Sequence, residues 1–196
     1  SRQGAKPLGV VAEGRVKYMR LPTQLTKRFR RSFPLRRCEL HIAGNPSLEL
    51  NISGTLGDMK IAFLGTGRMG TELAKHLIAN NDYEVRVWNR TLDKTTPLVD
   101  AGATAYPNAA EAVTGADVVI TALFGPKTVR SVVIEPDLIP AGIPWIDTTT
   151  VSPQDAEEFA ANVPTYIACP VVGTLGPARA GKLGVYVGSP DPQLRE

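Results

Sequence analysis

Three glycines in the segment MKIAFLGTGRMG, residues 59–70, carry the strongest chemical signal in the chain. They follow the pattern G-x-G-x-x-G between an apolar strand and a helical segment. In that context Gly65 permits a tight turn, a side chain at Gly67 would keep a pyrophosphate away from the backbone, and Gly70 lets helix and strand pack closely. The helix N-terminus offers the phosphates free N–H groups and a partial positive charge. The predicted cofactor-binding residues of this turn are Gly65, Thr66, Gly67, Arg68, Met69 and Gly70.

The end of the next strand predicts which dinucleotide is bound. NAD-binding domains place Asp or Glu there, where the carboxylate accepts hydrogen bonds from the adenosine ribose. Here the strand ends in Asn89, Arg90 and Thr91, and Glu84 lies at its opposite end. Arg90 can bind a 2′-phosphate through charge-assisted hydrogen bonds worth about 1.5–3 kcal/mol each, and Asn89 and Thr91 can add hydrogen bonds. The sequence therefore predicts NADP as the cofactor.

Short apolar runs that alternate with segments of helical period must position these residues. We expect strands at 60–65, 83–89, 103–106, 117–124, 143–150 and 165–169, and helices at 69–80, 93–102, 108–115, 126–134 and 152–162. The run 117–124 is almost continuously apolar, as in parallel strands that are buried on both faces. The alternation predicts right-handed βαβ units and an α/β fold with a doubly wound, mostly parallel Rossmann-type sheet.

The distribution of charge divides the chain at Met59. Residues 1–58 carry 11 Lys and Arg against 4 Asp and Glu, whereas residues 59–196 carry 11 against 15. We interpret residues 1–58 as a basic extension that is disordered or not part of the natural protein, with Met59 as a candidate natural start. The alternatives for this extension are an Arg-rich targeting peptide and an arm that binds nucleic acid or an anionic membrane. Residues 59–196 form the predicted NADP-binding domain.

The composition indicates the cellular compartment of the protein and the class of its binding partners. No apolar run approaches the roughly 18 residues that span a membrane. Two cysteines, Cys38 and Cys169, are too few for a disulfide framework, which favours a reducing compartment such as the cytoplasm. We expect a small-molecule substrate as the partner and no metal ion, and we do not expect nucleic acid or a membrane as a partner.

Together these motifs resemble the β-hydroxyacid dehydrogenase family, which includes 3-hydroxyisobutyrate dehydrogenases and, more distantly, imine reductases, and whose NADP-binding domain is shared with 6-phosphogluconate dehydrogenase. The glycine turn is similar to the family's G-x-G-x-M-G, and VWNRT is similar to its NADP-type second strand. The segments ADVVITALFGPKTVRSVV, IDTTTVSP and CPVVGTLGPARAGKL resemble its cofactor and substrate loops, so that the resemblance runs from Met59 to about Ser189. It implies cofactor contacts from Leu123, Phe124 and Thr150. It implies substrate contacts from Val172, Gly173 and Thr174.

The substrate loop departs from the family pattern at two positions. Val172 stands where the family usually has serine, and Thr174 stands where it has a glycine. The side chain of Val172 cannot form a hydrogen bond, so the substrate would be bound by backbone N–H groups of residues 172–174. A small 3-hydroxy acid or semialdehyde is the expected substrate, and an imine or another carbonyl compound is the alternative.

The resemblance also implies a proton donor, a lysine on the first long helix of a helical domain. That helix would follow Glu196, so we assign no catalytic residue within the chain and expect it to bind the cofactor but turn over little or no substrate. The family's dimer contacts come largely from the same domain, and we therefore expect a homodimer only for the full-length protein. A further hypothesis is a nucleotide-binding module without a catalytic role that uses its basic extension to bind a partner.

Overall fold

The computed structural model describes residues 17–18, 59–80 and 82–189 of the 196-residue chain. The predicted basic extension lies outside the described residues, apart from residues 17–18. The strands are β1 (Lys17–Tyr18), β2 (Met59–Leu64), β3 (Tyr83–Trp88), β4 (Thr104–Ala105), β5 (Val118–Thr121), β6 (Trp145–Asp147), β7 (Tyr166–Ala168), β8 (Val171–Val172) and β9 (Gly184–Val185). The helices are α2 (Arg68–Ile78), the 3₁₀-helix η1 (Leu92–Thr95), α3 (Thr96–Val99), α4 (Ala109–Val113), α5 (Pro126–Val129), the π-helix η2 (Arg130–Ile134), α6 (Pro153–Asn162) and α7 (Leu175–Arg179).

Six strands form the main sheet, in the order β4-β3-β2-β5-β6-β7. Every neighbouring pair in this sheet is parallel. The chain runs outward from β2 through β3 to β4 on one side, and from β5 through β6 to β7 on the other. This is the doubly wound arrangement, and the predicted α/β fold is confirmed.

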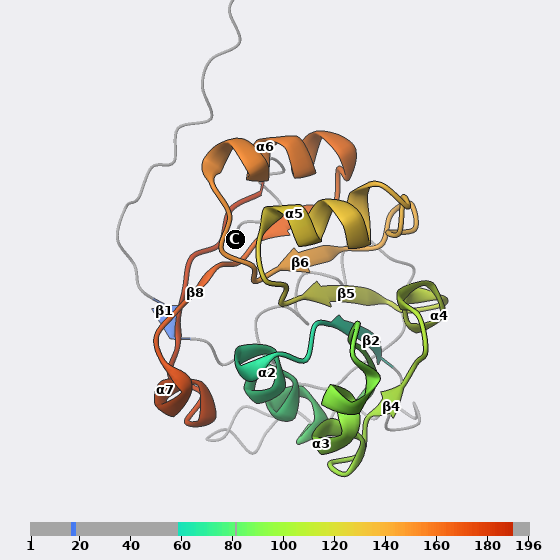
Figure 1. Ribbon diagram of the computed structural model, residues 1–196. Helices are drawn as coiled ribbons and strands as arrows, with labels where there is room; N and C mark the ends of the chain where they lie inside the picture. Colours follow the sequence, from blue (N-terminus) through green and yellow to red (C-terminus); the bar gives the residue numbers. More distant parts are fainter. Residues whose placement is uncertain (1–16, 19–58, 81, 190–196) are drawn as a thin grey trace, which may run out of the picture.

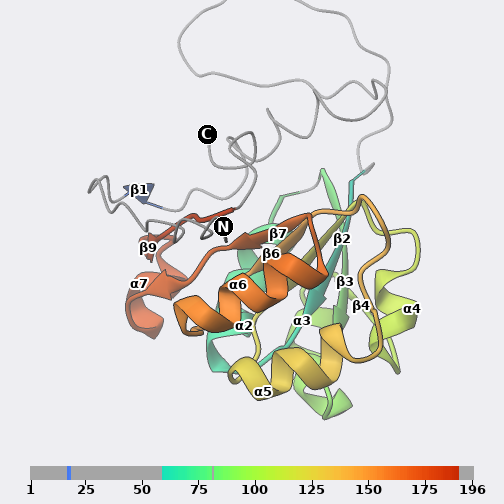
Figure 2. The same ribbon diagram turned by 90° about the horizontal axis from the view of Figure 1, so that it is seen from above.

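The side chains of β2 explain why helices cover both faces of the sheet. Ile61 and Phe63 enter one apolar core with side chains from α2, α3 and α7. Ala62 and Leu64 enter a second core with side chains from α4, α5, η2 and α6. Because successive residues of a strand point to opposite faces, a continuous apolar run must be covered on both sides. Figure 1 and Figure 2 show α2 and α3 on one side of the sheet and α5 and α6 on the other.

Two of the predicted helices have a different form. The helix expected at 93–102 is instead the short η1 followed by α3, because Pro97 has no N–H group with which to continue a helix and is favoured in the first turn of a new one. The helix expected at 126–134 begins as α5 and continues as the π-helix η2, whose end is marked by a hydrogen bond of 2.9 Å from Glu135 N to Arg130 O.

The edges of the main sheet are short or paired. At one edge, β4 is only two residues long. At the other edge, Ala168 at the end of β7 exchanges two backbone hydrogen bonds with Gly188, of 2.7 and 2.8 Å. The segment that reaches Gly188 also contains β9, which pairs antiparallel with β8 and with β1. The sequence did not predict β8 and β9, since a strand of two residues has too little periodicity to detect.

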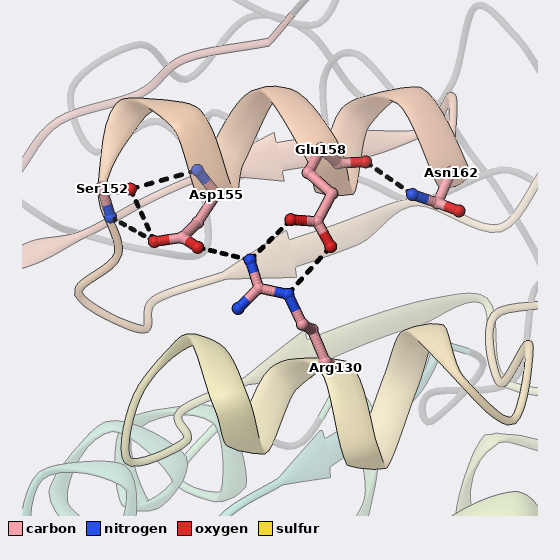
Figure 3. A network of polar contacts seen from close by, with 5 residues as sticks. All are labelled: Arg130, Ser152, Asp155, Glu158 and Asn162. Atoms are coloured by element: carbon pink, nitrogen blue, oxygen red, sulfur yellow. Dashed lines mark hydrogen bonds and ion pairs between the residues drawn. The ribbon is translucent and has the colours of Figure 1, made fainter.

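An arginine joins the helical segments α5–η2 and α6. Arg130 Nη2 lies 2.5 Å from Asp155 Oδ1 and 2.5 Å from Glu158 Oε2, and its Nε donates to Glu158 Oε1 at 2.9 Å (Figure 3). Asp155 is itself held in a capping box, in which Ser152 Oγ accepts from Asp155 N and Asp155 Oδ2 accepts from Ser152 N. The guanidinium also lies over the ring of Phe159, 5.5 Å from its centroid. One side chain therefore fixes the packing of two helical segments.

We expect Arg130→Gln to lower the melting temperature by a few degrees near neutral pH. Hydrogen bonds from Arg130 lower the pKa of Glu158, and hydrogen bonds from Ser152 and Arg130 lower the pKa of Asp155. A lowered folded-state pKa stabilises the fold above the ordinary carboxyl range, about pH 4, and this contribution is lost as the pH falls through the lowered value. The difference in melting temperature between wild type and variant should therefore shrink in acid. Arg179→Gln, which removes one ion pair of a more exposed arginine, is the control and should have a smaller effect.

Candidate dinucleotide-binding site

The glycine turn lies where the order of strands in the sheet reverses. It follows β2, whose two neighbours are β3 and β5, and the chain continues from these in opposite directions. In doubly wound sheets ligands bind outside the carboxyl ends of the strands at this switch point. The segments that follow β2, β3, β5 and β6 all leave the sheet at this edge, because the strands are parallel. They contain every cofactor-binding residue predicted from the sequence.

Two of the three glycines are required by the fold itself. Gly65 has φ +102°, and a Cβ atom there would lie 2.4 Å from the carbonyl oxygen of Ala122. A Cβ atom at Gly70 would lie 2.0 Å from the carbonyl oxygen of Gly65, so the start of α2 touches the turn directly. No side chain fits at either distance. These positions allow α2 to begin immediately after β2.

The third glycine has no such explanation within the protein. Gly67 has φ −68°, which any residue can adopt, and a Cβ atom there would meet nothing within 4 Å. It is the N-cap of the 11-residue helix α2, but no side chain caps the helix there. The first turn of α2 also contains no acidic residue. A bare, uncapped helix N-terminus with space above it fits a pyrophosphate, which would bind the N–H groups and occupy that space.

Hydrogen bonds join the glycine turn to the loop that follows β3. Asn89 Oδ1 accepts from Thr66 N at 3.1 Å, and Asn89 Nδ2 donates to the carbonyl oxygen of Thr91 at 2.9 Å. Thr66 Oγ1 donates to the carbonyl oxygen of Lys94 at 3.0 Å. The side chain of Asn89, predicted to contact the cofactor, thus also shapes the loop. This shaping role was missed in the sequence, because it depends on a contact between residues 23 positions apart.

Two exposed arginines belong to the segments that form this edge of the sheet. The described residues contain five arginines, of which Arg86, Arg130 and Arg179 bind carboxylates. Arg68, at the start of α2, and Arg90, after β3, are exposed and have no ion-pair partner among the described residues. Thr91, which follows Arg90, is also exposed. The edge of the sheet that carries the glycine turn therefore has two cations available for an anionic ligand. The carboxylate of Glu84 lies at the other end of β3, where it binds Arg86 Nε at 2.7 Å.

The loops after β5 and β6 present exposed side chains at the same edge. Phe124 is 100% exposed, which is uncommon for so large an apolar side chain, and Thr150 is also exposed. Met69 and Leu123 are half-buried. The backbone N–H group of Leu123 donates to Thr149 Oγ1 at 3.0 Å. A contact of Leu123 with a ligand would therefore use its side chain or its carbonyl oxygen rather than its N–H group.

A buried carboxylate lies beneath these loops. Asp147, the last residue of β6, has no exposed surface, and its Oδ1 accepts from Thr121 Oγ1 at 2.7 Å and from Thr149 N at 3.0 Å. The Tyr166 hydroxyl donates to Oδ2 over a longer distance of 3.5 Å. Burial raises the pKa of Asp147 above its ordinary value, although the hydrogen bonds from Thr149, Thr121 and Tyr166 oppose this shift. The sequence shows only an aspartate at a strand end, so this set of contacts was not foreseen.

The predicted substrate loop begins at the last residue of β8 and ends at the N-cap of α7. Val172, Gly173 and Thr174 are all exposed, and Gly173 has φ +142°. The short helix α7 that follows is anchored to α2, where His76 Nε2 lies 2.7 Å from the carbonyl oxygen of Ala178. Arg179 Nε donates to Glu72 Oε1 at 3.2 Å and adds a second contact between the two helices. One helix thus begins at the glycine turn and supports the substrate loop further along its length.

Cys169 is a free thiol that is only 8% exposed. Burial, with a smaller contribution from the charge of Asp147, raises the pKa of Cys169 to about 12, so the thiol stays protonated and unreactive. Within the described ranges no three His, Cys, Asp or Glu side chains gather closely enough to hold a metal ion. No helix in the part of the chain that the structure describes is long and apolar enough to cross a membrane.

Comparison with known proteins yields one family and several relatives. Residues 60–196 match the family described as the NAD binding domain of 6-phosphogluconate dehydrogenase. The chain is 33% identical over 152 residues to the probable 3-hydroxyisobutyrate dehydrogenase-like 1, mitochondrial, of Arabidopsis thaliana, and this match covers 72% of the chain and 45% of the relative.

Solved structures share the fold as well, and two of them serve as examples. The 3-hydroxyisobutyrate dehydrogenase of Mycobacterium tuberculosis with L-serine has a TM-score of 0.63 and 29% identity, over 70% of this chain and 48% of that one. Psf3 in complex with NADP+ and 2-OPP has a TM-score of 0.60 and 30% identity, over 65% of this chain and 48% of that one. The chain thus spans about half the length of the relatives it matches.

Proposed function

The chain belongs to the β-hydroxyacid dehydrogenase family and carries the nicotinamide-dinucleotide-binding domain of an oxidoreductase, and we propose that this domain binds NADP. We propose further that the protein transfers hydride between NADP(H) and a small 3-hydroxy acid or semialdehyde. The whole activity is a proposal, since the chain spans about half the length of its relatives.

One observation carries the choice of NADP over NAD. At the carboxyl end of β3, Arg90 is exposed and without an ion-pair partner among the described residues, and the nearest carboxylate of that strand, Glu84, lies at the opposite end. A carboxylate beside the ribose would repel a 2′-phosphate, whereas an unpaired guanidinium binds it. Arg68 adds a second cation at the start of α2. The bound NADP+ of a related structure is consistent with this choice.

The residues of this chain would bind and orient the two reactants. The N–H groups after Gly67 would hold the pyrophosphate, and the exposed Phe124 and Thr150 would line the end of the site nearer the substrate. The nicotinamide, when bound, supplies the hydride. Residues 172–174 would hold the substrate through backbone N–H groups, because Val172 has no polar side-chain atom. This domain would thus contribute to catalysis by holding the nicotinamide and the substrate close together in the reactive orientation.

The proton for the substrate oxygen would come from a lysine of a helical domain, as the family resemblance implies. Lys182 is exposed and follows α7, and we assign it no catalytic role. We propose that residues 59–196 bind the cofactor but turn over little substrate without that lysine. We also propose that the full-length enzyme is a homodimer and that it works in the cytoplasm, where the free thiol of Cys169 would stay reduced.

A second candidate is a reductase of imines or of another unusual carbonyl compound. The observation that favours it is Val172, whose side chain is 56% exposed in the substrate loop where a serine hydroxyl would bind a carboxylate. An apolar side chain at this place suits a less polar substrate. A full-length protein that reduces a cyclic imine but not a 3-oxo acid or semialdehyde would decide for this candidate.

The test of the proposed function is a pair of titrations of the chain with NADPH and NADH at one low salt concentration. We expect NADPH to bind at least about tenfold more tightly, because one charge-assisted hydrogen bond to the 2′-phosphate is worth that much. Arg90→Ala should remove this preference by weakening NADPH binding alone. Arg179→Ala, which removes an exposed arginine from α7, is the matched control and should keep the preference.

Two other results of these titrations would contradict the proposal in different ways. Equal affinity of the wild type for both dinucleotides would refute the role given to Arg90 while keeping the dinucleotide site. Binding of neither dinucleotide would refute the proposed site itself. Added salt should reduce the preference for NADPH, since the contact with the phosphate is exposed and is screened by ions.

A further inference from the structure

The carboxylate of Asp147 connects three neighbouring strands. It belongs to β6, it accepts a hydrogen bond from Thr121 at the end of β5, and it receives the longer hydrogen bond from Tyr166 of β7. Thr121 Oγ1 is in turn fixed by Trp145 Nε1, at 2.9 Å. All of these side chains are buried. The carboxylate therefore sits in a rigid setting at the edge of the sheet that carries the candidate site.

The same carboxylate orients both loops that are proposed to line the cofactor. Its Oδ1 accepts from Thr149 N, which holds the loop after β6 just before the exposed Thr150. Thr149 Oγ1 accepts from Leu123 N at 3.0 Å, which holds the loop after β5 just before the exposed Phe124. Thr149 is 3% exposed and links the carboxylate to both loops. A change in the carboxylate is thus passed to residues 123–124 and 149–150 through two hydrogen bonds.

No cation compensates this buried charge among the described residues. The titratable groups around it are Tyr166 and Cys169 from the β7 side, both of which burial keeps neutral. On α6, Asp155 is a further anionic group that acts on Tyr166, and Arg130 is already bound to Asp155 and Glu158. A buried carboxylate without a cation reduces the stability of a protein compared with a neutral side chain of the same shape. Its presence is therefore better explained by function than by stability.

We propose that Asp147 is a positioning residue of the candidate site, whose ionised carboxylate holds the loops after β5 and β6 in the geometry that binds the dinucleotide. This inference rests on the proposed function. The Oδ1 atom of an ionised carboxylate accepts from Thr121 Oγ1 and Thr149 N through charge-assisted hydrogen bonds, which are stronger than the bonds that the carbonyl oxygen of a protonated carboxyl group accepts. Protonation therefore loosens Thr149, and through it Leu123.

The inference predicts that cofactor affinity and stability respond to pH in opposite directions. Because burial raises the folded-state pKa of Asp147, the native protein binds more protons than the unfolded chain between the ordinary value, about 3.9, and the raised value. Protonation of Asp147 therefore adds to stability as the pH falls through this range, and the contribution is lost as the pH rises. The affinity for NADPH should fall over the same range. A residue with only a structural role would change the stability with pH and leave the affinity for NADPH unchanged.

The experiment measures NADPH affinity and the melting temperature of the chain from neutral to mildly acidic pH. We expect Asp147→Asn to bind NADPH about tenfold more weakly at neutral pH, because neutral hydrogen bonds replace charge-assisted ones, and to have a melting temperature equal to or above that of the wild type. Asp117→Asn is the matched control. Asp117 Oδ2 accepts from Lys60 N at 2.8 Å, but at the amino edge of the same sheet. The NADPH affinity of this variant should change with pH as that of the wild type does. Any pH dependence that comes from the 2′-phosphate, which titrates at about pH 6, is shared by all three proteins and does not distinguish Asp147→Asn.

Hydrogen exchange tests the same inference without a cofactor. The amide of Leu123 should exchange about tenfold faster in Asp147→Asn and in Thr149→Val, since each change weakens or removes its hydrogen bond. Thr149→Ser keeps the hydroxyl and should restore both the slow exchange and the affinity. Unchanged exchange of Leu123 in Asp147→Asn, or NADPH affinity with the wild-type value and pH profile, would overturn the inference while the proposed function stands. A wild type that binds no NADPH would instead overturn the proposed function, and with it the role of Asp147 toward the dinucleotide.

Discussion

Gly67→Asp is expected to reduce NADPH binding by at least about a hundredfold while leaving the protein folded and slightly more stable. The new side chain would stand in the open space above the start of α2, where a Cβ atom meets nothing in the protein. It would therefore occupy the place of the pyrophosphate and repel its charge. The same aspartate would cap α2, which has no side-chain cap, and should add about 0.5–1 kcal/mol to the free energy of unfolding.

Thermal unfolding and NADPH titration of one preparation check both halves of this prediction. Gly67→Ser is the matched variant, because it caps the helix and fills the space without adding charge. Its affinity should lie between those of the wild type and Gly67→Asp. A Gly67→Asp protein that binds NADPH as well as the wild type would show that no phosphate lies at this helix terminus.

Gly70→Ala is expected to destabilise the fold by about 3 kcal/mol, at the upper end of the range for overpacked cores. Its Cβ atom would lie 2.0 Å from the carbonyl oxygen of Gly65, which is backbone and cannot rotate away. Either α2 must move off the sheet or the turn must open, and both changes disturb the apolar core that α2 shares with β2. The melting temperature should fall by about 10 °C, and cofactor binding should be lost together with the turn.

Gly176→Ala provides the control for this second prediction. Gly176 lies within α7, and a Cβ atom there meets nothing within 4 Å. The same chemical change should stabilise the protein by about 0.5–1 kcal/mol, since alanine loses less conformational freedom in a helix than glycine does. A Gly70→Ala protein with a melting temperature near that of the wild type would mean that α2 does not approach β2 as closely as the structure has it.

The sequence predicted the parts of the fold that depend on local pattern. The apolar run of β5, the alternation of strands and helices and the glycine spacing were sufficient for the doubly wound sheet, and the five motifs together indicated the family; both are confirmed. The helical segments around Pro97 and Arg130 were predicted as single regular helices. They differ because proline chemistry and a π-type hydrogen bond interrupt the period that the sequence suggests.

The contacts of the candidate site were harder to foresee. The sequence selects Asn89 and Thr150 by their place in a motif, but it does not show that Asn89 is hydrogen-bonded to Thr66 or that Thr149 accepts from Leu123. Such contacts join residues more than 20 positions apart, and no periodicity encodes them. The burial of Asp147 is likewise a property of three strands together. The binding roles assigned to these residues from the sequence remain predictions.

The way the sheet ends has a consequence for the behaviour of the protein in concentrated solution. An open strand at the edge of a sheet offers unpaired N–H and C=O groups to the strands of other molecules, which is a common route to aggregation. Here β4 offers such groups over only two residues, and the outer side of β7 is already engaged by Gly188. Neither border is a long template on which a second chain could add a strand. The domain is thereby protected against edge-to-edge aggregation while leaving the carboxyl ends of its strands free for a ligand.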